Sequence, residues 1–149
     1  ESVVEVNASQ KARMVSKIRK ALGGSEADKT IAVLGLTFKP ETDDMRDSPS
    51  LAILPALADK GATIRAHDPE GMEEAKKLLP DSIEYIDSIY ETFENADAVI
   101  LLTEWNQYRG LDFEKVKNAM KGNVFVDLRN VYEKKTMKKL GFNYHCVGR

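Results

Sequence analysis

Cysteine, histidine and tryptophan are scarce in this chain of 149 residues, which contains one cysteine, two histidines and one tryptophan. The single cysteine, Cys146, excludes an internal disulfide framework and is typical of a reducing compartment, so we expect a cytoplasmic protein. With so few histidine and cysteine side chains, no cluster has the spacing that a metal ion needs. We therefore predict no metal site.

The sequence also lacks an excess of either charge and any long apolar run. Its formal net charge is −2, from 22 lysines and arginines against 24 acidic residues, so no basic field is present to hold nucleic acid. No apolar run is long enough to cross a bilayer. We expect neither a nucleic-acid nor a membrane partner, and any anionic ligand must be held locally by a few placed side chains.

The pattern that is present alternates strands with helices. Residues 2–22 carry apolar side chains at helical spacing, and Gly23-Gly24 end that helix. We then predict strands over 30–36, 63–67, 83–85, 98–102, 123–127 and 144–147, of which 30–36 and 98–102 are strongly apolar runs. Between them we predict helices over 49–60, 69–79, 87–95, 113–120 and 133–140. This alternation predicts an α/β fold with a Rossmann-like, doubly wound, mostly parallel sheet of order 3-2-1-4-5-6, preceded by an N-terminal helix.

In such a sheet the ligand crevice lies where the strand order reverses, at the carboxyl ends of the strands. Three polar clusters follow neighbouring strands there: Thr37-Phe38-Lys39, Thr103-Glu104-Trp105 and Asp127-Leu128-Arg129-Asn130. Lysine offers phosphate a compact charge, and arginine offers a planar fork for two oxygens. Taken singly, Lys39 would be an ordinary loop lysine and Arg129 the ion-pair partner of Asp127. Both at one crevice favour a site for an anionic nucleotide, with Phe38 against the base or sugar.

The glycine pattern that cradles NAD is missing from the first strand-to-helix turn. That cradle needs G-x-G-x-x-G, whereas Gly35 stands alone. Asp68 could mimic the ribose-binding acid of dinucleotide-binding domains, but its spacing from Gly35 is wrong. A helix N-cap before Pro69 is the better interpretation of this aspartate. On spacing alone, the acidic loop 41–47 with Arg46 is a solvated loop neutralised by its own ion pairs.

No complete catalytic centre can be found in the sequence. His145 and Cys146 are neighbours on a predicted strand, so their side chains point to opposite faces and cannot form a thiolate–imidazole pair. We expect Cys146 to be a buried, inert thiol. No nucleophile elbow or Walker loop occurs. The sequence also shows no environment that would raise the pKa of one carboxyl group in a pair of acids. Trp105 and Tyr108 could equally well line a pocket or cover the helix beneath them.

Residues 33–49, VLGLTFKPETDDMRDSP, closely resemble the signature of the C-terminal domain of the UDP-glucose/GDP-mannose dehydrogenase family. The resemblance continues through 61–69 (GATIRAHDP), 102–105 (LTEW) and 126–132 (VDLRNVY) to the end of the chain. It covers essentially the whole chain from about Thr30 onward, and the segment 6–11 resembles the end of the long helix that precedes this domain in the family.

This resemblance implies an enzyme that oxidises the C6 hydroxyl of UDP-glucose to a carboxylate with two NAD and a cysteine nucleophile. In that family an N-terminal domain holds NAD and supplies the cysteine, and neither feature occurs in this sequence. The resemblance further implies that residues 1–24 end a long interdomain helix, that residues 25–149 bind the UDP-sugar, and that the full-length enzyme is a homodimer. Because the chain begins at Glu1 and not at methionine, we expect a part of a longer protein that is inactive by itself.

By the same resemblance, Phe38 and Lys39 contact the nucleotide sugar, Arg129 contacts the substrate, and Arg46 reaches across the domain cleft to the NAD cofactor. The last role replaces the interpretation of Arg46 from spacing. Glu104 matches the family pattern without a defined role. The residues of the motifs resemble the UDP-glucose branch of the family more closely. A UDP-N-acetylmannosamine dehydrogenase or a GDP-mannose dehydrogenase is the alternative. Two further alternatives are a stand-alone nucleotide-binding module and an assembly domain with helix 2–22 as its interface.

Overall fold

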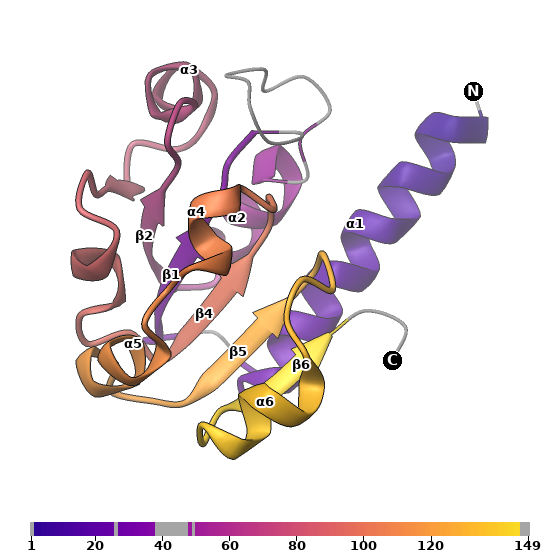
Figure 1. The fold of residues 1–149 in the computed structure, drawn as a ribbon. Helices are drawn as coiled ribbons and strands as arrows, with labels where there is room; N and C mark the ends of the chain where they lie inside the picture. The colour runs from indigo at the N-terminus through magenta and orange to yellow at the C-terminus, as the bar shows by residue number, and fades with distance from the viewer. Residues whose placement is uncertain (1, 26, 38–47, 49, 147–149) are drawn as a thin grey trace.

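The computed structural model describes residues 2–25, 27–37, 48 and 50–146, with the side chains of the first helix described from Ala12 onward (Figure 1). Helix α1, Ser2–Ala21, comes first. Its first half extends away from the rest of the chain in Figure 1, and its last turns pack beside helix α2. Ile18, near the end of α1, is fully buried. The predicted N-terminal helix is thus confirmed, and its second half contributes to the core.

The sheet has six parallel strands in the order β3-β2-β1-β4-β5-β6. Their bounds are β1 Thr30–Leu34, β2 Thr63–His67, β3 Glu84–Tyr85, β4 Ala98–Leu101, β5 Val124–Asp127 and β6 Asn143–Cys146. The order predicted from the alternation of strands and helices is confirmed. Leu34 lies opposite Leu101, which lies opposite Asp127. Strands β1, β4 and β5 therefore end level with one another, and we call the loops that follow them (residues 35–37, 102–105 and 128–132) the carboxyl edge.

Helices and one 3-10 helix connect the strands on both sides. They are α2 Ser50–Asp59, α3 Met72–Leu78, the 3-10 helix η1 Tyr90–Phe93, α4 Asn106–Arg109, α5 Phe113–Ala119 and α6 Lys134–Lys139. None of the helices in the described ranges is both long and apolar enough to cross a membrane.

Two predictions of helices were wrong in detail, and one helix was missed. The helix expected over 87–95 is only a 3-10 turn, in which the N–H groups of Thr92 and Glu94 donate to carbonyls three residues back, and Asn95 after it donates to Ala119. Helix α3 begins at Met72 with Gly71 as its N-cap, so Asp68 is not a helix cap. The carboxylate of Asp68 instead binds the N–H groups of Glu70 and Gly71 in the turn before the helix. The short helix α4 was not predicted.

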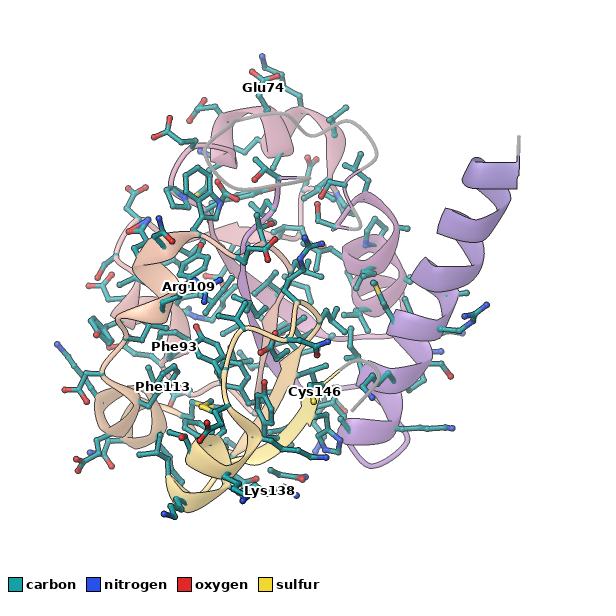
Figure 2. The ribbon with its side chains drawn as sticks, turned by 45° about the vertical axis from the view of Figure 1, so that its right-hand side comes forward. Glu74, Phe93, Arg109, Phe113, Lys138 and Cys146 are labelled. Atoms are coloured by element: carbon teal, nitrogen blue, oxygen red, sulfur yellow. The ribbon has the colours of Figure 1, made fainter. Side chains whose placement is uncertain are left out.

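Each face of the sheet carries its own apolar core. Helices α1, α2 and α3 cover one face, where Ile18, Ile31, Val33, Ile53, Leu57 and Val126 are among the buried residues. Elements η1, α4, α5 and α6 cover the other, with Leu34, Phe93, Leu101, Tyr108, Val116 and Phe125. In Figure 2, Phe93 and Phe113 lie near each other on this second side. Strand β1 is buried on both faces, as its continuous apolar run predicts.

Candidate functional site

Gly35 lets the ends of β1 and β4 approach closely. Its φ of +92° is a conformation that side chains with a Cβ rarely adopt. A Cβ at this position would lie 2.4 Å from the Cβ and 2.6 Å from the backbone nitrogen of Thr103. The N–H of Gly35 donates to the carbonyl of His67 at 2.8 Å. The lone glycine of the first turn therefore serves the packing of three strand ends.

Asp68 holds the start of the loop that leads to the predicted ligands. Its carboxylate is fully buried, and Oδ2 accepts hydrogen bonds from the N–H of Leu36 at 2.6 Å and of Thr37 at 3.2 Å. Oδ1 accepts from the N–H groups of Glu70 and Gly71, at 2.9 and 2.6 Å. Both oxygens are thus engaged by backbone donors. The alternative that Asp68 mimics a ribose-binding acid does not fit this arrangement.

Two serines hold the far end of the same loop. The hydroxyls of Ser48 and Ser50 both donate to the carbonyl of Leu36, at 2.5 and 2.7 Å. The residues on either side of segment 38–47 are therefore tied to each other. Phe38, Lys39 and Arg46 fall within that segment and lie outside the described residues, so their roles stay predictions.

Thr103 links the loop after β4 to the loop after β1. Its hydroxyl donates to the carbonyl of Thr37 at 2.6 Å, and the side chain is almost completely buried. Thr37 lies two positions before Lys39. The position of the chain entering the predicted lysine site is thus fixed from two sides, by Asp68 and by Thr103.

Asp127 organises the loop after β5. Its Oδ1 accepts from the N–H of Arg129 at 2.9 Å. Its Oδ2 accepts from the N–H groups of Val131 and Tyr132 at 2.7 and 3.0 Å and from the hydroxyl of Tyr144 at 2.6 Å. The alternative ion pair between Arg129 and Asp127 is wrong, because Asp127 binds the backbone N–H of Arg129 whereas the guanidinium binds another acid. An aspartate at a strand end, followed by a short loop, is the sequence signal that could have indicated this turn.

The guanidinium of Arg129 pairs instead with Glu104, from the loop after β4. Oε1 of Glu104 accepts from Nε of Arg129 at 3.1 Å and from Nη2 at 2.5 Å. The two side chains are 35% and 29% exposed, so the pair lies at the surface of the carboxyl edge and not in the core. The sequence placed Glu104 at this edge without a role, and it missed this contact.

A chain of buried hydrogen bonds runs beneath the carboxyl edge. The hydroxyl of Tyr108 donates to the carbonyl of His67 at 3.0 Å and lies 2.9 Å from Nδ1 of the same histidine. The hydroxyl of Tyr132 donates to the carbonyl of Tyr108 at 2.5 Å. Burial lowers the pKa of His67, against the opposing influence of Asp68 and Asp87. Burial also raises the pKa of Tyr108, with a further contribution from Asp68, so both rings are neutral structural groups.

Trp105 and Tyr108 are core residues, which decides between the two alternatives left open for them. Tyr108 is fully buried and Trp105 is 5% exposed, both in the apolar cluster under α4 and α5. The indole Nε1 of Trp105 is buried and has no hydrogen-bond partner among the residues that the structure describes. The flanks of Glu104 are therefore firmly packed: Thr103 on one side and Trp105 on the other.

Cys146 is a buried free thiol, as predicted. It packs in the cluster with Tyr144, whereas His145 points to the opposite face, where burial together with Lys17 and Lys138 lowers its pKa. Across the part of the chain that the structure describes, no group of three or more His, Cys, Asp or Glu side chains could hold a metal ion. A surface hollow of about 520 Å³ between the end of α2 and Pro80-Ser82 lies away from the carboxyl edge.

The comparisons with known proteins point to one family. The family model for the UDP binding domain of the UDP-glucose/GDP-mannose dehydrogenase family matches residues 32–134. A UDP-glucose 6-dehydrogenase of Rhizobium meliloti (strain 1021) is 48% identical over 149 residues, which are 100% of this chain and 34% of the relative. The UDP-glucose 6-dehydrogenase TuaD of Bacillus subtilis (strain 168) is 38% identical over 149 residues, 100% of this chain and 32% of that relative.

Solved structures agree with these matches. A UDP-glucose dehydrogenase from Pyrobaculum islandicum aligns with a TM-score of 0.75 and 33% identity, over 96% of this chain and 30% of that one. The chain spans about a third of the length of the curated relatives that it matches. Because the family model covers more than half of the sequence, this chain belongs to the UDP-glucose/GDP-mannose dehydrogenase family and corresponds to its UDP-binding domain.

Proposed function

We propose that this chain is the UDP-sugar-binding part of an NAD-dependent UDP-glucose 6-dehydrogenase, a cytoplasmic enzyme that converts UDP-glucose to UDP-glucuronate. The two curated relatives described above, both UDP-glucose 6-dehydrogenases, support the choice of uridine sugar. Residues 25–149 form the sugar-nucleotide domain. Residues 1–24 form the end of a helix that leads to an NAD-binding region and joins two copies of the full-length enzyme.

The observation that carries this proposal is the arrangement of Arg129 at the carboxyl edge. Its guanidinium is held by Glu104, one residue beyond Thr103, and Thr103 in turn holds the chain just before Phe38 and Lys39. Strands β1 and β5 both flank β4, and neighbouring strands lie about 4.8 Å apart, so their ends are separated by about 10 Å. A lysine and an arginine that extend from these two ends can contact the two phosphates of one diphosphate.

The domain's own contribution is to bind and orient, since it supplies no nucleophile. Lys39 and Arg129 neutralise the diphosphate, and Phe38 packs on the sugar or base, which fixes the position of the glucose C6 hydroxyl. Arg46 contacts NAD, which is held mainly by a region outside this sequence and accepts the hydride when bound. Cys146 takes no part, because it is buried in the apolar core.

Titration calorimetry of this domain with UDP, UDP-glucose, GDP and NAD tests the proposal. We expect UDP and UDP-glucose to bind, GDP to bind more weakly, and NAD to give no measurable heat. Lys39→Ala and Arg129→Ala should each weaken UDP binding by about tenfold or more. Lys121→Ala is the matched control, because Lys121 is an exposed cation in the loop before β5, at the opposite edge of the sheet. Absence of heat or of thermal stabilisation at millimolar UDP would refute the proposal.

A further inference from the structure

Glu104 occupies one edge of the Arg129 guanidinium and leaves the other edge open. A guanidinium has five N–H donors, and Oε1 of Glu104 accepts one from Nε and one from Nη2. The donors on Nη1 and the second donor on Nη2 bind none of the described residues. The open pair of nitrogens is the edge that matches two oxygens of a phosphate.

Glu104 is itself mounted on a fixed piece of backbone. Thr103 before it is buried and bonded to the carbonyl of Thr37. Trp105 after it is 5% exposed and packed in the core. Glu104 has only its own side-chain torsions to vary, and the carboxylate is therefore restricted to a small region next to Arg129. A long arginine side chain held in this way loses less conformational freedom when a ligand binds.

The charge of Glu104 acts in the opposite direction. A carboxylate next to a diphosphate site repels the ligand, although solvent screens much of that repulsion at a pair that is about one-third exposed. Glu104 could therefore either orient Arg129 for the ligand or compete with the ligand for Arg129. The geometry favours orientation, because Glu104 contacts the Nε–Nη2 edge and leaves the Nη1–Nη2 edge accessible.

We propose that Glu104 is a positioning residue: it holds the guanidinium of Arg129 with its outer edge directed at the diphosphate of the nucleotide sugar. This inference rests on the proposed function, in which Arg129 binds UDP. It gives a role to Glu104, for which the sequence indicated none. It also means that one dipeptide, Thr103-Glu104, sets the position of both predicted anion-binding loops, the first through Thr37 and the second through Arg129.

A double-mutant cycle tests the inference, with UDP affinity of the domain measured by calorimetry for the wild type, Glu104→Ala, Arg129→Ala and the double variant. We expect Glu104→Ala to weaken UDP binding by about tenfold and to have almost no further effect once Arg129 is alanine. Glu104→Gln should retain affinity within about threefold, because the amide oxygen accepts from the same donors without the charge. Glu94→Ala, which removes an exposed acid from the loop before β4, should leave the affinity unchanged.

The sign of the effect decides between orientation and competition. Tighter or unchanged UDP binding in Glu104→Ala overturns the positioning role, as does an equal loss in the presence and absence of Arg129. Wild-type affinity in Arg129→Ala overturns the proposed contact of Arg129 as well, and so separates the two failures. Thermal unfolding checks that Glu104→Ala is folded; if it is not, Glu104→Asp, which shortens the side chain by one methylene, takes its place with the same expected loss.

Discussion

Substitution of Gly35 by alanine tests whether the close approach of β1 and β4 at the carboxyl edge is as tight as the structure indicates. Gly23 provides a matched control. The two glycines have nearly the same φ, +92° and +90°, but a Cβ on Gly23 would meet nothing within 4 Å, whereas a Cβ on Gly35 would lie 2.4 Å from the Cβ of Thr103. The pair of variants therefore separates backbone strain from steric overlap.

The expected magnitudes follow from these two terms. Alanine in a left-handed conformation costs about 1–2 kcal/mol, which is the whole effect expected for Gly23→Ala. Overlap in a well-packed region adds about 1–3 kcal/mol. Relief is difficult at position 35, because the contacts include the backbone nitrogen of Thr103 at 2.6 Å. We expect Gly35→Ala to lose about 2–5 kcal/mol of unfolding free energy, a large part of the 5–15 kcal/mol typical of a domain.

Urea unfolding followed by circular dichroism measures both variants under the same conditions. The midpoint should fall much further for Gly35→Ala than for Gly23→Ala, with unchanged m-values if the denatured state is unaffected. UDP affinity should also fall for Gly35→Ala alone, because a shift of Thr103 disturbs Thr37 and Glu104 together. Equal losses of stability in the two variants would refute the steric reasoning.

Three further predictions concern buried groups. Asp127→Ala should cost about 3–5 kcal/mol in urea unfolding, because three backbone N–H groups and the Tyr144 hydroxyl lose their acceptor; a loss below about 1 kcal/mol contradicts this. Folding lowers the pKa of His67, so below about pH 6.5 the unfolded state binds more protons than the folded state. The free energy of unfolding therefore decreases as the pH is lowered, by at most about 1.4 kcal/mol per pH unit for this residue. His67→Asn should flatten the fall between pH 7 and pH 5, and an unchanged slope argues against it. Cys146 should react with a thiol reagent no faster than the domain unfolds, and rapid labelling of the native protein would show that the thiol is accessible.

The sheet order was accessible from the sequence because strands alternate with helices along the chain and the central strands β1 and β4 are short apolar runs. Four consecutive residues of β1 and all of β4 are buried, and such runs are recognisable without an alignment. The helices were less predictable where a single side chain or backbone contact sets the boundary. Asp68 delays α3 to Met72 by taking the N–H groups of the preceding turn. α4 is one turn long and has no period to detect.

The candidate site was predictable to the level of loops but not of partners. Strand order alone brings the loop of Arg129 next to that of Glu104. The alternative that paired Arg129 with Asp127 followed sequence proximity, which says nothing about which groups this carboxylate already binds. Asp127 accepts hydrogen bonds from backbone donors and from Tyr144, a residue of the last described strand. Such long-range competition for one carboxylate depends on the assembled fold.

The acids at and next to the carboxyl edge therefore have different roles according to their burial. Asp68 and Asp127 are fully buried, and both oxygens of each accept hydrogen bonds from backbone N–H groups or a hydroxyl, so these two carboxylates fix the shape of the loops. Glu104 is part-exposed and binds the guanidinium of Arg129, a residue of the loop that Asp127 holds in place. Loss of a buried acid should thus appear first as lost stability, with affinity falling only as the loop is lost. Loss of Glu104 should appear as lost affinity at nearly unchanged stability, because an exposed ion pair contributes about 1 kcal/mol or less to folding.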